Sequence, residues 1–114
     1  MDKGAFGEEI AAHYLEQKGW TILYRNWRKG VHEIDLIAQD EDELVFVEVR
    51  ALSASVPWHA ENTITGRKQE RLRRAIATFY HYHPEHETCP ARIDIVAIRL
   101  TRPPEIYHLT DAFR

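Results

Sequence analysis

The segment EIDLIAQDEDELVFVEVR, residues 33–50, decides how the 114-residue chain is interpreted. It contains two runs of alternating apolar residues on either side of Glu41 and Asp42, a pattern that predicts two strands joined by a tight turn. Acidic residues interrupt both runs. Because a buried carboxylate without a partner costs several kcal/mol, their presence inside two strands requires a physical explanation.

A turn at Glu41 and Asp42 fixes which residues of the two strands face each other. The resulting register pairs Ile34 with Val49, Leu36 with Val47 and Ala38 with Val45 on an apolar face, and Glu33 with Arg50, Asp35 with Glu48 and Ile37 with Phe46 on the other face. Like charges that face each other across two strands are destabilising. A Mg²⁺ ion would compensate Asp35 and Glu48, since it takes oxygen ligands and keeps several waters. Alternatively, a register shifted by one residue would separate the two acids and leave ordinary strand-edge charges.

The rest of the chain supplies the elements that would flank this hairpin. Apolar periodicity and terminating residues predict helices over residues 5–18 and 62–83, and strands over residues 20–24, 91–100 and 105–109, the last at a sheet edge. Residues 25–30, RNWRKG, are expected to form a loop, with packing favoured over base stacking for Trp27. We therefore predict a single α/β domain spanning residues 1–114, in the order α-β-β-β-α-β with a central mixed sheet flanked by helices.

Composition limits the functional classes. The formal net charge is −3, and the lone Cys89 excludes an internal disulfide and a Cys-x-x-Cys zinc site. No apolar run approaches the roughly 18 to 20 residues that cross a bilayer, so the expectation is a soluble cytoplasmic protein without a membrane partner.

A basic run contrasts with the acidic hairpin. Five cations, Arg67, Lys68, Arg71, Arg73 and Arg74, fall within eight positions of the second predicted helix. Phosphate binding depends on such a local patch more than on net charge, although a basic helix face is often only solvated. Both interpretations stay open at this point.

Several ordered motifs resemble known proteins. Asp35, followed on the next strand by Glu48-Val49-Arg50, looks like the PD-(D/E)xK nuclease motif. The segments FGEEIAAHYL, RNWR, EIDLIAQD, LVFVEVR, RKQERLRRA and RIDIVAI resemble, in that order, the uncharacterised bacterial YraN-like family, over residues 6–98. That family is predicted to share the restriction-endonuclease-like fold, with its αβββαβ core, and to be related to archaeal Holliday-junction resolvases.

The resemblance implies a Mg²⁺-dependent (or Mn²⁺-dependent) endonuclease that hydrolyses DNA, with branched DNA as the family-level substrate. The implied catalytic residues are Glu8, Asp35, Glu48 and Arg50, and the implied metal ligands are Asp35, Glu48 and Glu33. The expected nucleic-acid contacts are Arg28, Arg67, Lys68, Gln69, Arg71 and Arg74. Because resolvases of this fold act as two-fold dimers, a homodimer is a further option.

The motif also contains a departure. Arg50 stands where the nuclease motif has lysine, and arginine holds a phosphate or developing charge but does not shuttle protons. The alternative to an active nuclease is therefore a nucleic-acid-binding module that keeps the nuclease fold without turnover. A third option is a scaffold that binds only protein, for which DNA affinity would be weak.

Overall fold

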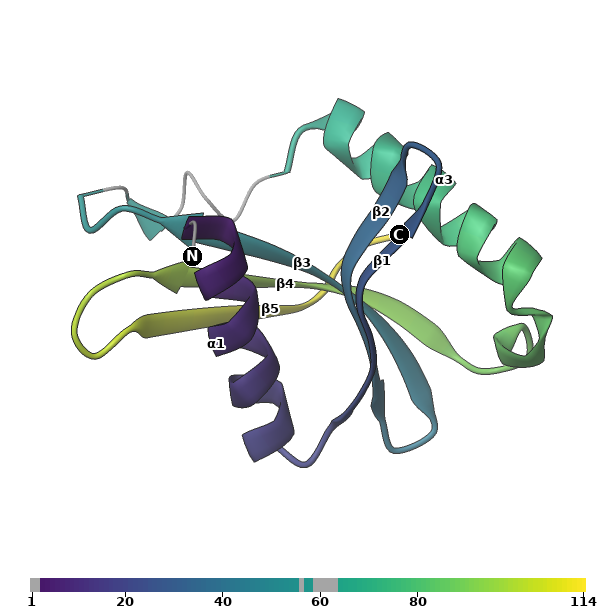
Figure 1. Cartoon of the computed structure of the whole chain (residues 1–114), viewed down its shortest axis with the longest axis horizontal. Helices are drawn as coiled ribbons and strands as arrows, with labels where there is room; N and C mark the ends of the chain where they lie inside the picture. Colours follow the sequence, from purple (N-terminus) through teal and green to yellow (C-terminus); the bar gives the residue numbers. More distant parts are fainter. Residues whose placement is uncertain (1–2, 56, 59–63) are drawn as a thin grey trace.

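A computed structural model describes residues 3–55, 57–58 and 64–114 of the chain. These residues form an α/β fold consistent with a restriction-endonuclease-like core (Figure 1). Its elements are α1 (Lys3–Gln17), β1 (Thr21–Lys29), β2 (His32–Asp40), β3 (Glu43–Leu52), α3 (Gly66–Tyr82), the 3₁₀ helix η1 (Pro84–His86), β4 (Ala91–Arg99) and β5 (Glu105–Phe113).

The five strands form one mixed sheet in the order β1-β2-β3-β4-β5. Neighbouring strands are antiparallel except β3 and β4, which run parallel. A parallel pair needs a crossover connection, and the segment containing α3 provides it. The predicted edge strand at residues 105–109 is confirmed as part of β5, which extends further, to Phe113.

Alternate residues of β3 contribute to two separate cores, one on each face of the sheet. Val45 and Val47 pack with Leu36 and Ala38 beneath α1, as the predicted apolar face requires. Leu44 and Phe46 pack on the opposite face, against α3. β3 is therefore covered by a helix on both sides, and its polar residues at 48 and 50 lie beyond the most deeply buried part of the strand.

The expected loop at residues 25–30 is wrong, because β1 continues through it to Lys29. The side chain of Trp27 is 7% exposed and packs edge-on to Phe79 of α3, with ring centroids 5.4 Å apart, so the predicted packing role is confirmed. Asn26 adopts φ +51° within this strand, a left-handed conformation that asparagine tolerates better than most residues.

The helix predicted over residues 62–83 begins at Gly66, after its N-cap residue Thr65, and ends at Tyr82. The Oγ1 atom of Thr65 accepts a hydrogen bond from the backbone amide of Lys68, which satisfies one of the free donors of the first turn. The first residues of the predicted helix, Asn62 and Thr63, lie outside the described residues. No helix in the described part of the chain is long and apolar enough to cross a membrane.

A buried carboxylate on β4 holds several elements together. The side chain of Asp94 is fully buried, and it accepts hydrogen bonds from Arg92 Nε at 2.9 Å, the Asp111 amide at 2.9 Å and His108 Nε2 at 2.7 Å. Burial alone would raise the pKa of Asp94, but the bonds from His108 and Arg92 outweigh this effect and hold the pKa below its usual value. Asp94 is thus an ionised group whose charge is fully compensated.

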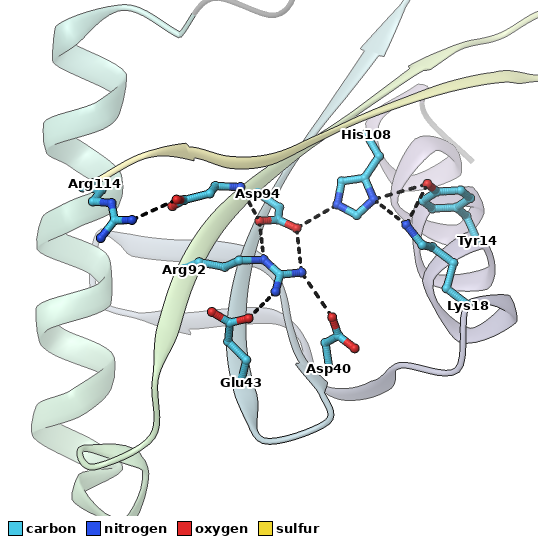
Figure 2. A network of polar contacts seen from close by, with 9 residues as sticks. Tyr14, Lys18, Asp40, Glu43, Arg92, Asp94, His108 and Arg114 are labelled. Carbon is cyan, nitrogen blue, oxygen red and sulfur yellow. Dashed lines mark hydrogen bonds and ion pairs between the residues drawn. The ribbon is translucent and has the colours of Figure 1, made fainter.

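The network around Asp94 reaches three further parts of the fold (Figure 2). Arg92 bonds Glu43 and lies 3.4 Å from an oxygen of Asp40, both beside the β2–β3 turn. On the other side, His108 Nδ1 lies 3.2 Å from Tyr14 Oη and 3.2 Å from Lys18 Nζ on α1. The network therefore fixes α1, β5 and the β2–β3 turn relative to β4.

Replacing Asp94 with alanine should strongly destabilise the protein. The change leaves Arg92 and His108 buried without their shared acceptor, and breaking a buried pair in this way costs on the order of 3–5 kcal/mol. Chemical denaturation at neutral pH measures the free energy of unfolding. The matched control is Glu105→Ala, which removes a surface partner 3.3 Å from Arg99 and should cost no more than about 1 kcal/mol. Equal losses in the two variants would contradict the role assigned to Asp94.

Candidate metal and nucleic-acid site

The β2–β3 ladder ends close to the predicted acidic pair. Paired residues run from Asp40↔Glu43 to Leu36↔Val47, which confirms both the turn at Glu41 and Asp42 and the register of this part of the hairpin. Beyond Leu36, the backbone amide of Val49 bonds a side chain of β2 in place of the β2 backbone. The Oδ2 atom of Asp35 accepts this hydrogen bond, at 2.8 Å. The two strands therefore part at the point where the acids begin.

This separation corrects part of the predicted register. The facing pairs Ile34–Val49, Asp35–Glu48 and Glu33–Arg50 do not belong to the ladder. Ile34 packs in the core beneath α3, whereas Val49 packs beside the core beneath α1, so the predicted apolar face does not extend to this pair. At this point the Val49 amide bonds the Asp35 side chain in place of the β2 backbone, while Ile34 pairs with Trp27 of β1 and packs with it beneath α3.

Asp35 and Glu48 nevertheless lie near enough to interact electrostatically. Burial, the neighbouring charge of Glu48, and the smaller effects of Glu8 and Glu33 together raise the pKa of Asp35 to about 8, although the Val49 amide opposes this shift. Burial also raises the pKa of Glu48, against the opposing influence of Arg50. The charges of the other three predicted acidic residues, Glu8, Glu33 and Glu48, thus all act on Asp35.

Glu8 reaches this group because α1 approaches β3 very closely. A Cβ atom on Gly7 would lie 3.0 Å from the Cβ of Ala51, so a larger residue here would push the helix and the strand apart. The next residue, Glu8, is half-buried, while Glu9 is exposed and pairs with Arg25 at 3.2 Å. The two adjacent glutamates therefore lie in different environments.

Cations from two elements face the acids. Arg50 follows Glu48 on the same strand, and Lys68 and Arg71 come from the first two turns of α3. All three lower the pKa of Glu48, with Arg50 having the largest effect. A carboxylate pair on strands and a set of cations on a helix therefore meet at the place where β2 and β3 diverge.

The remaining predicted residues occupy the periphery. Arg28 lies 3.4 Å from Glu33 in an exposed ion pair near the β1–β2 turn. Gln69 donates to the Ile64 carbonyl at 3.0 Å and accepts from Arg73 at 3.2 Å, so its side chain supports the start of α3. Arg67 and Arg74 line a groove of about 440 Å³, together with Val31, His32, Glu70 and Arg71.

The donor set suits a hard cation with a partly open coordination shell. Among the described residues, no three His, Cys, Asp or Glu side chains come together as a complete metal site. Mg²⁺ is commonly held by one or two carboxylates, with water and substrate phosphate supplying the other oxygens. Asp35 and Glu48 fit that requirement, and Arg50 and Lys68 would lie beside the phosphate.

Comparisons with known proteins place the chain in a family. The model of the uncharacterised protein family UPF0102 matches residues 7–98. The chain belongs to the UPF0102 family. It is 47% identical to the UPF0102 protein of Chloroflexus aurantiacus strain J-10-fl over 98 residues, covering 83% of this chain and 77% of that protein. It is also 38% identical to a UPF0102 protein of Frankia casuarinae over 112 residues, covering 96% and 94% of the two chains.

The residues that match the UPF0102 family include both the strands that carry the acids and the helix that carries the cations. It contains Gly7, the two diverging strands and α3, and it ends at Ile98 within β4. Sequence reasoning identified the acids and the helix cations of this UPF0102 protein but missed Gly7, Asn26 and Val31. The signal for Gly7 is a glycine within a predicted helix, and the signal for Asn26 is an asparagine next to a predicted strand. The position of Val31 beside α3 depends on how elements distant in sequence pack.

Asp35→Asn should make the metal-free protein more stable at alkaline pH. The raised pKa means that the native carboxyl binds its proton more tightly than the unfolded one, so stability falls as pH rises from about 4 to about 8. Asparagine does not titrate, and its oxygen can keep the Val49 bond. At about pH 9 we expect a gain of at least about 1 kcal/mol over wild type, shrinking toward pH 5.

Urea denaturation across this pH range, with chelator present, measures the effect on the free energy of unfolding. Asp42→Asn, at an exposed position in the adjacent turn, is the matched control and should follow the wild-type profile. A variant at position 35 that is less stable than wild type at alkaline pH would show that the buried charge carries no penalty.

Proposed function

We propose that this UPF0102 protein is a Mg²⁺-dependent nuclease that hydrolyses DNA phosphodiesters, with Asp35 and Glu48 as the metal-binding carboxylates. The observation that carries the proposal is the contrast between Asp94, which is fully buried, and Asp35, which is partly buried. Asp94 is surrounded by donors that compensate its charge, and its pKa is lowered. Asp35 has acidic neighbours and one backbone donor, and its pKa is raised.

The ionised form of Asp35 is unfavourable in the folded chain. Burial next to Glu48, Glu8 and Glu33 penalises the ionised form, so these acids raise the free energy of the metal-free native state. Groups with such strongly perturbed titration are concentrated at functional sites. A divalent cation would offset the penalty, and the nuclease motif formed by Asp35 and Glu48-Val49-Arg50 supports the same assignment.

The chemistry divides between the carboxylates and the cations. A bound Mg²⁺ would supply Lewis-acid polarisation of the phosphate group. The guanidinium of Arg50 stays protonated throughout, so its role is to stabilise the negative charge that develops on the phosphate oxygens. Lys68 and Arg71, which also act on Glu48, hold and orient the sugar–phosphate backbone from the side of α3.

Mg²⁺ binding should require Asp35 and should strengthen with pH. Because the metal competes with a proton on a group whose pKa is about 8, the apparent affinity should rise about tenfold per pH unit below that value. Calorimetry in buffers of different ionisation enthalpy measures the affinity and the proton released per ion bound. Mg²⁺ and Mn²⁺ are titrated into metal-free wild type, Asp35→Asn and the control Asp42→Asn. Equal binding by all three proteins would contradict the assignment.

A DNA-binding module without turnover is the second candidate, and Arg50 at the lysine position favours it. The two candidates differ in what the carboxylates do. In a nuclease, Asp35→Asn abolishes cleavage. In a binding module, removing this negative charge leaves DNA affinity equal or makes it tighter, and no cleavage occurs in any variant.

Cleavage assays on linear and branched DNA with Mg²⁺ or Mn²⁺ separate these candidates. For a nuclease, we expect Asp35→Asn to reduce the rate at least about 100-fold, and Arg50→Ala to reduce it by a similar factor through loss of charge stabilisation. Arg50→Lys restores both the charge and the motif residue and should retain more activity than Arg50→Ala. Cleavage that survives Asp35→Asn in purified protein would indicate a contaminating enzyme or another site.

A further inference from the structure

The closed end of the β1–β2 hairpin lies beside α3 (Figure 1). Gly30 and Val31 connect the two strands, and Lys29 and His32 form the last pair of the ladder. Gly30 adopts φ +60°, which supplies the positive angle that the turn needs. Val31 carries no such requirement, yet its side chain is 90% exposed, more than any other large apolar side chain in the described chain.

The surroundings of Val31 are cationic. It lines the groove of about 440 Å³ with Arg67, Arg71 and Arg74 of α3, in which Glu70 is the single acidic residue. Glu70 is shared between Arg73 and Arg74, at 3.6 and 3.5 Å, so the groove keeps a positive balance. An isolated exposed valine needs no explanation, but one placed at the rim of a basic groove is suited to a partner that is both anionic and apolar.

The groove leads directly to the candidate site. Arg71 lines the groove and also acts electrostatically on Glu48, as does Lys68 one turn earlier on α3. A strand whose phosphate lies at Asp35 and Glu48 could therefore continue along α3 with its backbone against these cations. Its bases would then pass the β1–β2 turn.

We infer that Val31 is a wedge that contacts an unstacked base while the groove between the β1–β2 turn and α3 holds the phosphate backbone. This inference rests on the proposed action on DNA and names the kind of DNA preferred: duplex in which base stacking is already interrupted. Apolar side chains inserted at a base step replace part of the lost stacking, and the energetic cost is lowest where a base is already unpaired. In a continuous duplex, Val31 could contact a base face only after that base had been unstacked, which costs free energy.

The test compares two DNAs of the same length and flanking sequence, one a continuous duplex and one with a short single-stranded gap next to a 2-aminopurine. Binding is followed by fluorescence anisotropy with Ca²⁺ in place of Mg²⁺, so that cleavage does not intervene. Wild type should bind the gapped DNA several-fold more tightly and change the 2-aminopurine fluorescence. Val31→Ser should lose both effects and bind continuous duplex as wild type does, whereas Val31→Ile should keep both.

Two groove variants test the backbone contacts. Arg67→Gln and Arg74→Gln should weaken binding to both DNAs and each reduce the slope of log affinity against log salt by about one. Because Val31 is exposed, thermal unfolding of its variants should match wild type.

The outcomes separate the wedge from the proposed function. If wild type binds both DNAs equally, or Val31→Ser keeps the preference for the gap, the wedge is overturned while DNA binding stands. If wild type binds neither DNA with Ca²⁺ or Mg²⁺ present, the proposed action on DNA fails and the wedge fails with it.

Discussion

One hydrogen bond, from the Val49 amide to the Asp35 side chain, stands at the point where the two strands part and the candidate site begins. The β2–β3 ladder ends at Leu36 and Val47, and beyond it the Val49 amide bonds the Asp35 side chain. Ile34 pairs instead with Trp27 of β1 and packs beneath α3. The bond holds Asp35 between the strands, where burial and the neighbouring acids raise its pKa.

The alternation of apolar residues and the two-residue turn were sufficient to predict the hairpin register from the turn to the pair Leu36–Val47. A register shifted by one residue would move the apolar side chains to the wrong face of the sheet. The pattern was insufficient where side chains override it. RNWRKG has the composition of a loop, but burial of Trp27 against Phe79 extends the strand. Ile34 changes to the other core for the same reason, since it follows Trp27, its partner across the ladder.

The candidate site was predictable as far as it is built from neighbours in the hairpin and from a basic helix face. What could not be predicted comes from contacts between distant segments. The bond of Asp94 with His108 and the contact of His108 with Tyr14, 94 residues away, depend on how α1 settles on the sheet. Likewise, the approach of Val31 to Arg71 exists only because the hairpin crosses α3.

The two helices pack into separate cores, yet one residue of α3 belongs to both sides of the candidate site. Leu72, Ala75 and Phe79 anchor α3, and the same helix carries Arg67, Arg71 and Arg74 along the groove. Arg71 lines this groove and also lowers the pKa of Glu48. A substitution at Arg71 would therefore change the groove and the surroundings of the carboxylates together, so the basic helix and the acidic strands are not independent surfaces.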